Sequence, residues 1–171
     1  MSGLFFFSLI PVLFFYEQTS FNQKEPYYER PLAVASNILL LRKDSYGQGY
    51  FGASRNNGRI HEGIDIVTPV GSSVIASKSG RVSFAGDDVG YGHYVEILHP
   101  DGLVTRYAHL SRVQVKEGEW VAQNQVIGAS GKTGNANRLK ITPHLHFEIR
   151  YKNQPLNPSS HLLDPNIHLE T

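Results

Sequence analysis

Short runs in which apolar and polar residues alternate fill the chain from Tyr46 onward, and glycines recur between them. Alternation with a period of two is typical of strands that bury one face, and no segment after Tyr46 keeps a helical period over about ten residues. Residues 72–86 and residues 93–110 each predict two strands, joined near Ser79-Gly80 and at the turn Asp101-Gly102 respectively. The pattern therefore predicts a mainly β domain.

Two more segments extend this pattern. Residues 113–131 predict two short strands around Glu117-Gly118, and residues 144–151, HLHFEIRY, predict the last clear strand. In that last strand one face is apolar and the other polar, the polar face consisting of His144, His146, Glu148 and Arg150. A face that meets only solvent needs charge, and two imidazoles side by side indicate a site instead.

The chain divides into four parts. Residues 1–16 contain an uncharged run at 4–15, LFFFSLIPVLFF, which is too short to cross a bilayer, since a spanning helix takes about 20 residues. Its length fits the apolar part of a secretory signal peptide or an N-terminal anchor, but no Lys or Arg precedes it and no small-x-small cleavage site follows it. We assign 17–45 to a linker or N-terminal extension, 46–165 to the main domain and 166–171 to a C-terminal tail.

Composition narrows the classes of function. The 171 residues carry a formal net charge of +1, which gives no case for nucleic acid or an anionic membrane surface as the main partner. The chain has no cysteine, so disulfides and thiolate metal sites are excluded. A bound metal ion must therefore be held by histidine and carboxylate.

His61 and Asp65 form an H-x-x-x-D arrangement. Gly63 lies between them and lets the chain bend, so that both side chains can converge on one point. The competing interpretation is a turn aspartate beside a surface histidine. A catalytic zinc takes three protein ligands and keeps its fourth position open, and His61, Asp65 and one member of the H-x-H pair would make that set.

The remaining histidines near this set are candidates for proton transfer. They are whichever member of the H-x-H pair is not a ligand, and His109, the next-to-last residue of the run LVTRYAHL. His109 shares its strand parity with Thr105 and Tyr107, so regular alternation predicts that the three face the same way. The alternative for His109 is a histidine satisfied at a strand end.

Four separated segments carry a family resemblance. They are GRIHEGIDIVTPVGSSVIASKSGRVSFAG, GYGHYVEILHPDGLVTRYAHLS, VKEGEWVAQNQVIGASGKTGN and TPHLHFEIR. Together, and in this order, they resemble the M23 metallopeptidases, the lysostaphin-type or LytM-type peptidoglycan endopeptidases. The resemblance runs from about Gly47 to Pro158 and leaves residues 1–45 outside it.

The resemblance implies a single antiparallel β-sandwich-like domain of the duplicated hybrid motif type, with a groove across its sheet. It implies that His61, Asp65 and His146 bind one zinc ion, and that His109 and His144 are the catalytic histidines beside it. It also implies a zinc-dependent endopeptidase that hydrolyses peptide cross-links or bridges of bacterial peptidoglycan. Such a protein would be exported to the periplasm, the cell envelope or the medium, with the N-terminus either cleaved or retained as a membrane anchor.

Two other functions stay in competition. An M23-like module could bind zinc without catalysis and act as a cell-wall binding or activator protein, although this chain keeps all five family residues. A sugar-phosphotransferase carrier of the glucose type has a similar fold, but the H-x-H strand and the apolar N-terminus favour the peptidase. The sequence leaves open which peptide bond is cut and whether residues 17–45 cover the groove or act as a spacer.

Overall fold

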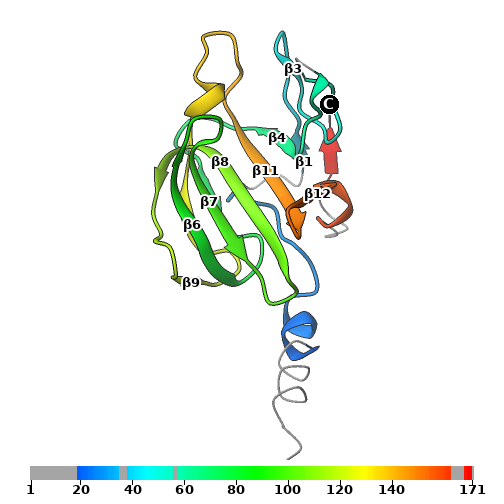
Figure 1. Ribbon diagram of the computed structural model, residues 1–171, viewed down its shortest axis with the longest axis vertical. Coiled ribbons are helices and arrows are strands. Elements are labelled where there is room, and N and C mark those ends of the chain that lie inside the picture. The colour runs from blue at the N-terminus through cyan, green and yellow to red at the C-terminus, as the bar shows by residue number, and fades with distance from the viewer. Residues whose placement is uncertain (1–18, 35–37, 56–57, 163–167, 171) are drawn as a thin grey trace, which may run out of the picture.

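One nine-stranded antiparallel sheet forms the body of the protein within the residues that the computed structural model describes, 19–34, 38–55, 58–162 and 168–170 (Figure 1). The central strands run in the order β12-β11-β8-β7-β6-β9, with β4 paired to β11 and with β10 joining β8 to β5. The predicted mainly β, antiparallel fold is confirmed. The strand bounds are β4 (Ile64–Val67), β5 (Ser73–Ile75), β6 (Gly80–Asp88), β7 (Gly92–Leu98), β8 (Leu103–Val113), β9 (Trp120–Val121), β10 (Val126–Ser130), β11 (His144–Tyr151) and β12 (Gln154–Leu156).

Smaller elements surround this sheet. Residues 19–24 are helical, and two 3-10 turns, η2 (Gly134–Ala136) and η3 (Pro158–Ser160), lie in the later loops. Strand β1 (Ile38–Leu40) pairs in parallel with β13 (His168–Glu170), and β2 (Lys43–Asp44) pairs with β3 (Gly47–Gln48). Leu41 forms an isolated bridge to Ile66, so the chain beside β1 lies along the free edge of β4.

The apolar face of β11 forms the centre of the core, as its alternation predicts. Leu145, Phe147 and Ile149 are fully buried there, and the Phe147 ring lies 5.3 Å from the ring of Tyr107 on β8. Each fully buried side chain of this size contributes about 1.5–3 kcal/mol of transfer free energy. The core therefore fixes which face of β11 points outward, and with it the positions of His144 and His146.

The predicted strands need one correction and one addition. The two strands predicted within 113–131 are β9 and β10, and the turn between them lies at 122–125. Glu117-Gly118, which was predicted to lie between the two strands, belongs to the loop before β9. Beyond β11, which was predicted as the last clear strand, the structure adds the short strands β12 and β13. Both are only three residues long, which gives too little alternation to recognise in a sequence.

The segment 19–34 packs on the end of the sheet opposite the β6–β7 turn (Figure 1). Tyr28 and Leu32 are buried in the core, and the Tyr28 hydroxyl donates to the carboxylate of Asp101 in the β7–β8 turn. The carboxylate of Glu25 accepts hydrogen bonds from the backbone N–H and the hydroxyl of Ser79. This part of the predicted extension therefore packs into the domain.

The predicted apolar N-terminal segment, residues 1–16, lies outside the described residues. Among the residues that are described, no helix has the length and apolar character needed to cross a membrane.

Candidate metal centre

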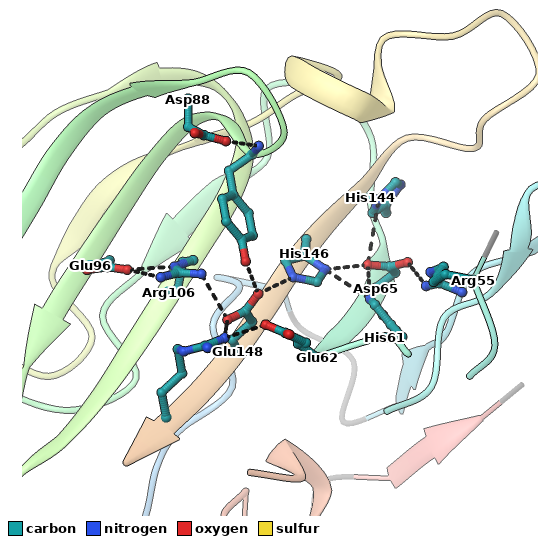
Figure 2. Close-up of polar contacts among 12 residues, drawn as sticks. Arg55, His61, Glu62, Asp65, Asp88, Glu96, Arg106, His144, His146 and Glu148 are labelled. Carbon is teal, nitrogen blue, oxygen red and sulfur yellow. Dashed lines mark hydrogen bonds and ion pairs between the residues drawn. The ribbon is translucent and has the colours of Figure 1, made fainter. Parts of the chain in front are cut away.

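Strand pairing brings two of the predicted ligands together. In the antiparallel register of β4 and β11, Asp65 lies directly opposite His146. Side chains of directly opposed residues lie on the same face of a sheet, so both point away from the core. The Nδ1 atom of His146 lies 2.8 Å from Oδ1 of Asp65 (Figure 2).

His61 approaches the same point from the segment before β4. Its Nε2 atom lies 3.0 Å from Oδ1 of Asp65 and 3.0 Å from Nδ1 of His146. The Nδ1 atom of His61 donates to the backbone carbonyl of Tyr50 at 2.9 Å, which leaves Nε2 with a free lone pair. The predicted convergence of His61 and Asp65 is observed.

Gly63 permits this convergence for a reason other than the predicted one. The φ angle of Gly63 is not in the positive range found for other glycines of the described chain, so its backbone conformation does not by itself require glycine. A Cβ atom at Gly63 would instead lie 2.3 Å from the carbonyl oxygen of Phe147. Only glycine lets the chain pass this close to β11.

The three donor atoms fit a single metal ion. Two imidazole nitrogens and one carboxylate oxygen are a donor set that zinc accepts, and Zn–N and Zn–O bonds of about 2.0–2.2 Å let one ion reach three atoms this close together. All three side chains are buried, so water screens the charges of the cluster only weakly. Burial by itself would lower the pKa of His146, but hydrogen bonds to Asp65 and Glu148 outweigh it and raise that pKa to about 9. The site thus favours positive charge at Nδ1, where a cation would replace the proton.

Two arginines hold the other oxygen of Asp65. Arg42 donates to Oδ2 from Nε at 3.1 Å and from Nη2 at 2.8 Å, and Arg55 donates to the same atom at 3.2 Å. Burial by itself would raise the pKa of Asp65, yet its hydrogen bonds to His146 and His61 hold that pKa well below its usual range. The carboxylate is therefore charged, with Oδ2 bound to the arginines and Oδ1 facing the histidines.

His109 and His144 lie beside the three predicted ligand atoms. Their rings are 5.1 Å apart in an edge-to-face arrangement, and the His109 ring lies 5.7 Å from the His146 ring. The Nδ1 atom of His109 contacts the carbonyl of Thr133 at 3.0 Å, and that of His144 contacts the carbonyl of Thr142 at 2.7 Å. Burial lowers the pKa of both histidines, that of His109 to about 3. Both rings are therefore neutral at physiological pH.

The orientation of His109 differs from the parity prediction. Thr105 and Tyr107 are fully buried and contact the core side, whereas His109 lies against His144 and His146 on the other side of the sheet. His109 has a φ of 61°, and the pairing register of β8 shifts around it on the β7 and β10 sides. A left-handed residue at an irregularity of this kind ends the alternation and turns the side chain to the opposite face.

Three further residues at the site, Glu148, Tyr91 and Arg42, were not predicted as site residues from the sequence. Glu148 accepts a hydrogen bond from Nε2 of His146 at 2.8 Å, and the hydroxyl of Tyr91 donates to the same oxygen at 2.9 Å. Arg42 is the third. Glu148 carried a usable signal, since it shares a face of β11 with the H-x-H pair, whereas nothing in the sequence linked Tyr91 or Arg42 to Asp65 and His146.

A groove of about 720 Å³ opens over these residues. All five predicted site residues line it, together with Arg55 and Tyr91. Residues 19–34 do not line it, whereas Arg42 and Tyr46 do. The structure thus brings together His61, Asp65, His109, His144 and His146 in one buried cluster at the floor of an open groove.

Comparison with known proteins identifies the class of protein that this fold and site define. The model of peptidase family M23 matches residues 59–158. Because the match covers more than half of the chain, the chain belongs to peptidase family M23, and the predicted resemblance is confirmed.

Three known proteins illustrate the relationship. The chain is 45% identical over 102 residues to the DD-carboxypeptidase/endopeptidase Mpg of Neisseria meningitidis, which covers 60% of this chain and 23% of Mpg. It is 39% identical over 113 residues to the murein hydrolase activator NlpD of Escherichia coli, which covers 66% of this chain and 28% of NlpD. A solved zinc-containing peptidase from Vibrio cholerae superposes with a TM-score of 0.57 and 32% identity, over 75% of this chain and 39% of that one. The chain spans about a quarter of the length of the two curated relatives.

Proposed function

We propose that this protein is a zinc-dependent endopeptidase that hydrolyses peptide cross-links or bridges of bacterial peptidoglycan. The observation that carries the proposal is the buried cluster of five residues at the floor of the groove. Three of its atoms, His61 Nε2, Asp65 Oδ1 and His146 Nδ1, lie within 3.0 Å of one another. These residues would hold one zinc ion per chain.

A zinc ion bound there supplies Lewis acidity, which polarises a peptide carbonyl and activates water for attack near neutral pH. His109 and His144 line the groove beside the proposed ligands, so a peptide bound there would bring its carbonyl close to both histidines. Each of these histidines has Nδ1 engaged by a backbone carbonyl, so each presents Nε2 to the substrate. At Nε2 a neutral imidazole takes up a proton and returns it to the leaving amine, and the protonated ring stabilises negative charge on the carbonyl oxygen.

The substrate class follows from the relatives. Mpg is named as a DD-carboxypeptidase/endopeptidase, and another relative, ShyA of Vibrio cholerae, is named as a peptidoglycan DD-endopeptidase. These names support peptidoglycan peptides as the substrate of this chain. Acting on peptidoglycan places the protein outside the cytoplasm, in the periplasm, the cell envelope or the medium. Export by a signal peptide, or anchoring through residues 1–16, is part of the same proposal.

A second candidate function is a zinc-binding activator that does not cleave peptidoglycan itself. It is favoured by the similarity to NlpD, which is named as an activator of murein hydrolases. In this chain all five of the family residues are present, and four of them are histidines with buried side chains. Catalysis therefore remains the function that the site supports best.

Digestion of purified peptidoglycan tests the proposal. The zinc-loaded protein is incubated with peptidoglycans of two cross-link types, one joined through diaminopimelate and one through glycine bridges, and the product masses are read. Cleavage of a peptide bond in at least one of them is the expected result. His146→Ala is expected to lose both zinc and cleavage, and His168→Ala serves as the control because His168 is exposed on β13.

Two outcomes would contradict the proposal. If the zinc-loaded protein releases no fragment from either peptidoglycan but stimulates a separate murein hydrolase, the activator function holds instead. If His146→Ala retains stoichiometric zinc, the ligand assignment fails.

A further inference from the structure

Glu148 is a fully buried carboxylate whose two oxygens face different partners (Figure 2). Oε1 accepts from Nε2 of His146 at 2.8 Å and from the hydroxyl of Tyr91 at 2.9 Å. Oε2 accepts from Nη1 of Arg106 at 3.2 Å and from Nη1 of Arg150 at 2.6 Å. A carboxylate has about four lone-pair sites, so every acceptor position of Glu148 is in use.

The sheet fixes Glu148 in this place. It lies two residues after His146 on β11 and therefore shares its face, and it pairs across the sheet with Arg106 of β8. Arg106 is itself held by Glu96 on β7, with 2.6 Å between Nε and Oε1. Glu148 is therefore an ordered acceptor on rigid strands, held on the side of the His146 ring away from Asp65.

We propose that Glu148 is the positioning residue of the metal centre, because it holds the proton of His146 on Nε2 and so keeps Nδ1 available to the metal ion. A neutral imidazole carries one proton, and the partner of one ring nitrogen decides which nitrogen has it. Glu148 is an acceptor only, so the nitrogen that faces it must be the donor. The remaining lone pair then lies on Nδ1, beside His61 and Asp65. This inference rests on the proposed zinc function and explains how the chain prepares that site.

The two arginines make the carboxylate different from an amide of the same shape. In Glu148→Gln, the side-chain NH2 cannot face Arg106 and Arg150, because all three groups are donors. The amide oxygen must take the place of Oε2, and the NH2 then points at His146 and Tyr91. An NH2 group there makes Nε2 the acceptor and moves the ring proton to Nδ1, where it blocks the metal ion. Glutamine at position 148 is thus expected to be as harmful as alanine, although it has the size of glutamate.

Zinc affinity of the 171-residue chain tests this inference. Zinc dissociation constants are measured by competition with a chromophoric chelator for the wild type, Glu148→Gln, Glu148→Ala and Glu96→Gln, and thermal unfolding of each zinc-free protein reports whether it is folded. Loss of an outer partner of a metal-bound histidine typically weakens binding by about 10- to 100-fold. Both variants at position 148 are expected to fall in that range, with Glu148→Gln no better than Glu148→Ala. Glu96→Gln removes a charge from the same network without touching His146, and its zinc affinity should change by less than about threefold.

The outcomes separate this inference from the proposed function. If the wild type itself binds no zinc, the proposed function has failed. If the wild type binds zinc and Glu148→Gln binds it equally well, the positioning role of Glu148 is wrong while the metal centre stands. If Glu148→Ala does not fold, Glu148→Gln decides alone, since it keeps the side-chain volume. A Glu148→Gln affinity that is close to wild type while Glu148→Ala is weak would show that only the volume matters, and would overturn the inference.

Discussion

Arg42 and Asp65 form a buried ion pair in which two guanidinium nitrogens of the arginine, Nε and Nη2, donate to the same carboxylate oxygen, Oδ2. The same two residues are also joined through their backbones, since the N–H of Arg42 donates to the carbonyl of Asp65 at 2.8 Å. The third guanidinium nitrogen, Nη1, binds Asp44 at 2.6 Å. Arg42, which lies in the predicted extension, thus holds in place the Asp65 carboxylate that we propose as a zinc ligand.

Replacement of Arg42 should destabilise the fold. Arg42→Ala leaves the buried carboxylate of Asp65 with only Arg55 among its arginine partners, and removal of one member of a buried ion pair typically costs about 3–5 kcal/mol. Urea unfolding in the presence of a chelator measures this loss without a contribution from zinc. Arg112→Ala is the matched control, because Arg112 is exposed. A loss below about 1 kcal/mol for Arg42→Ala would mean that the pair is not structural.

Replacement of His109 or His144 should lower catalysis without releasing zinc, unlike replacement of a proposed ligand. His109→Ala and His144→Ala are expected to retain zinc and to lose turnover by about 100-fold or more, the usual scale for general acid–base groups. Zinc content by mass spectrometry and the rate of cross-link cleavage are measured on the same samples. Loss of zinc in either variant would make that residue a ligand and would refute the division of roles.

Acid should destabilise the protein partly through His99, which is remote from the metal centre. His99 is buried, with Nδ1 3.0 Å from the carbonyl of Ser79 and Nε2 2.8 Å from the hydroxyl of Thr105. Burial lowers its pKa to about 4. In the unfolded chain its pKa is about 6.5, so below that pH the unfolded state binds a proton that the folded state does not. Its contribution to stability is therefore complete above about pH 6.5 and is lost as the pH falls toward about 4, by roughly 3 kcal/mol.

The measurement compares the free energy of unfolding of the wild type and His99→Gln over this pH range. The other histidines titrate in both proteins, so their effects cancel in the difference. The wild type should lose more stability on acidification than the variant does. Parallel pH profiles would show that His99 does not contribute.

Removal of the first part of the chain should affect stability more than catalysis. Residues 19–34 do not line the groove, whereas Tyr28 and Leu32 lie in the core. A chain that begins at Ser36 should cleave peptidoglycan as fast as one that begins at Glu17, at equal zinc occupancy and at a temperature where both are folded. Its stability should be lower by about 3 kcal/mol or more, since loss of even one large core side chain costs that amount. A large rise in rate on truncation would instead show that the removed segment occludes the groove.

The sequence predicted those parts of the site that depend on local periodicity. Alternation along 144–151 is enough to place His144, His146 and Glu148 on one face of a strand, because strand side chains alternate regardless of the neighbours. The H-x-x-x-D spacing and the end of the run LVTRYAHL made His61, Asp65 and His109 further candidates, and the family resemblance implied which of the five candidates are ligands and which are catalysts. The structure gathers the four histidines and Asp65 in one cluster, while their roles as ligands and catalysts stay predictions.

Contacts between distant segments could not be predicted in this way. The pairing of Asp65 with His146 depends on the register of β4 and β11, and the contact of Arg42 with Asp65 depends on a segment that runs beside the edge of β4. Gly63 matters because of a carbonyl 84 residues later in the chain, at Phe147. Such contacts arise from packing of many segments at once and leave no periodic signal.

The sequence by itself determined the class of fold, the family and the residue types available to a metal ion, because alternation, motif order and the absence of cysteine are properties of the chain. Only the tertiary structure decided which way His109 faces, because a left-handed residue at a strand irregularity overrides alternation. It also decided which buried groups contact the proposed ligands, since Glu148 faces Nε2 of His146 and Arg42 faces Oδ2 of Asp65 only after the sheet has formed. The reason is that strand register and edge packing are set by the whole core, which no single segment contains.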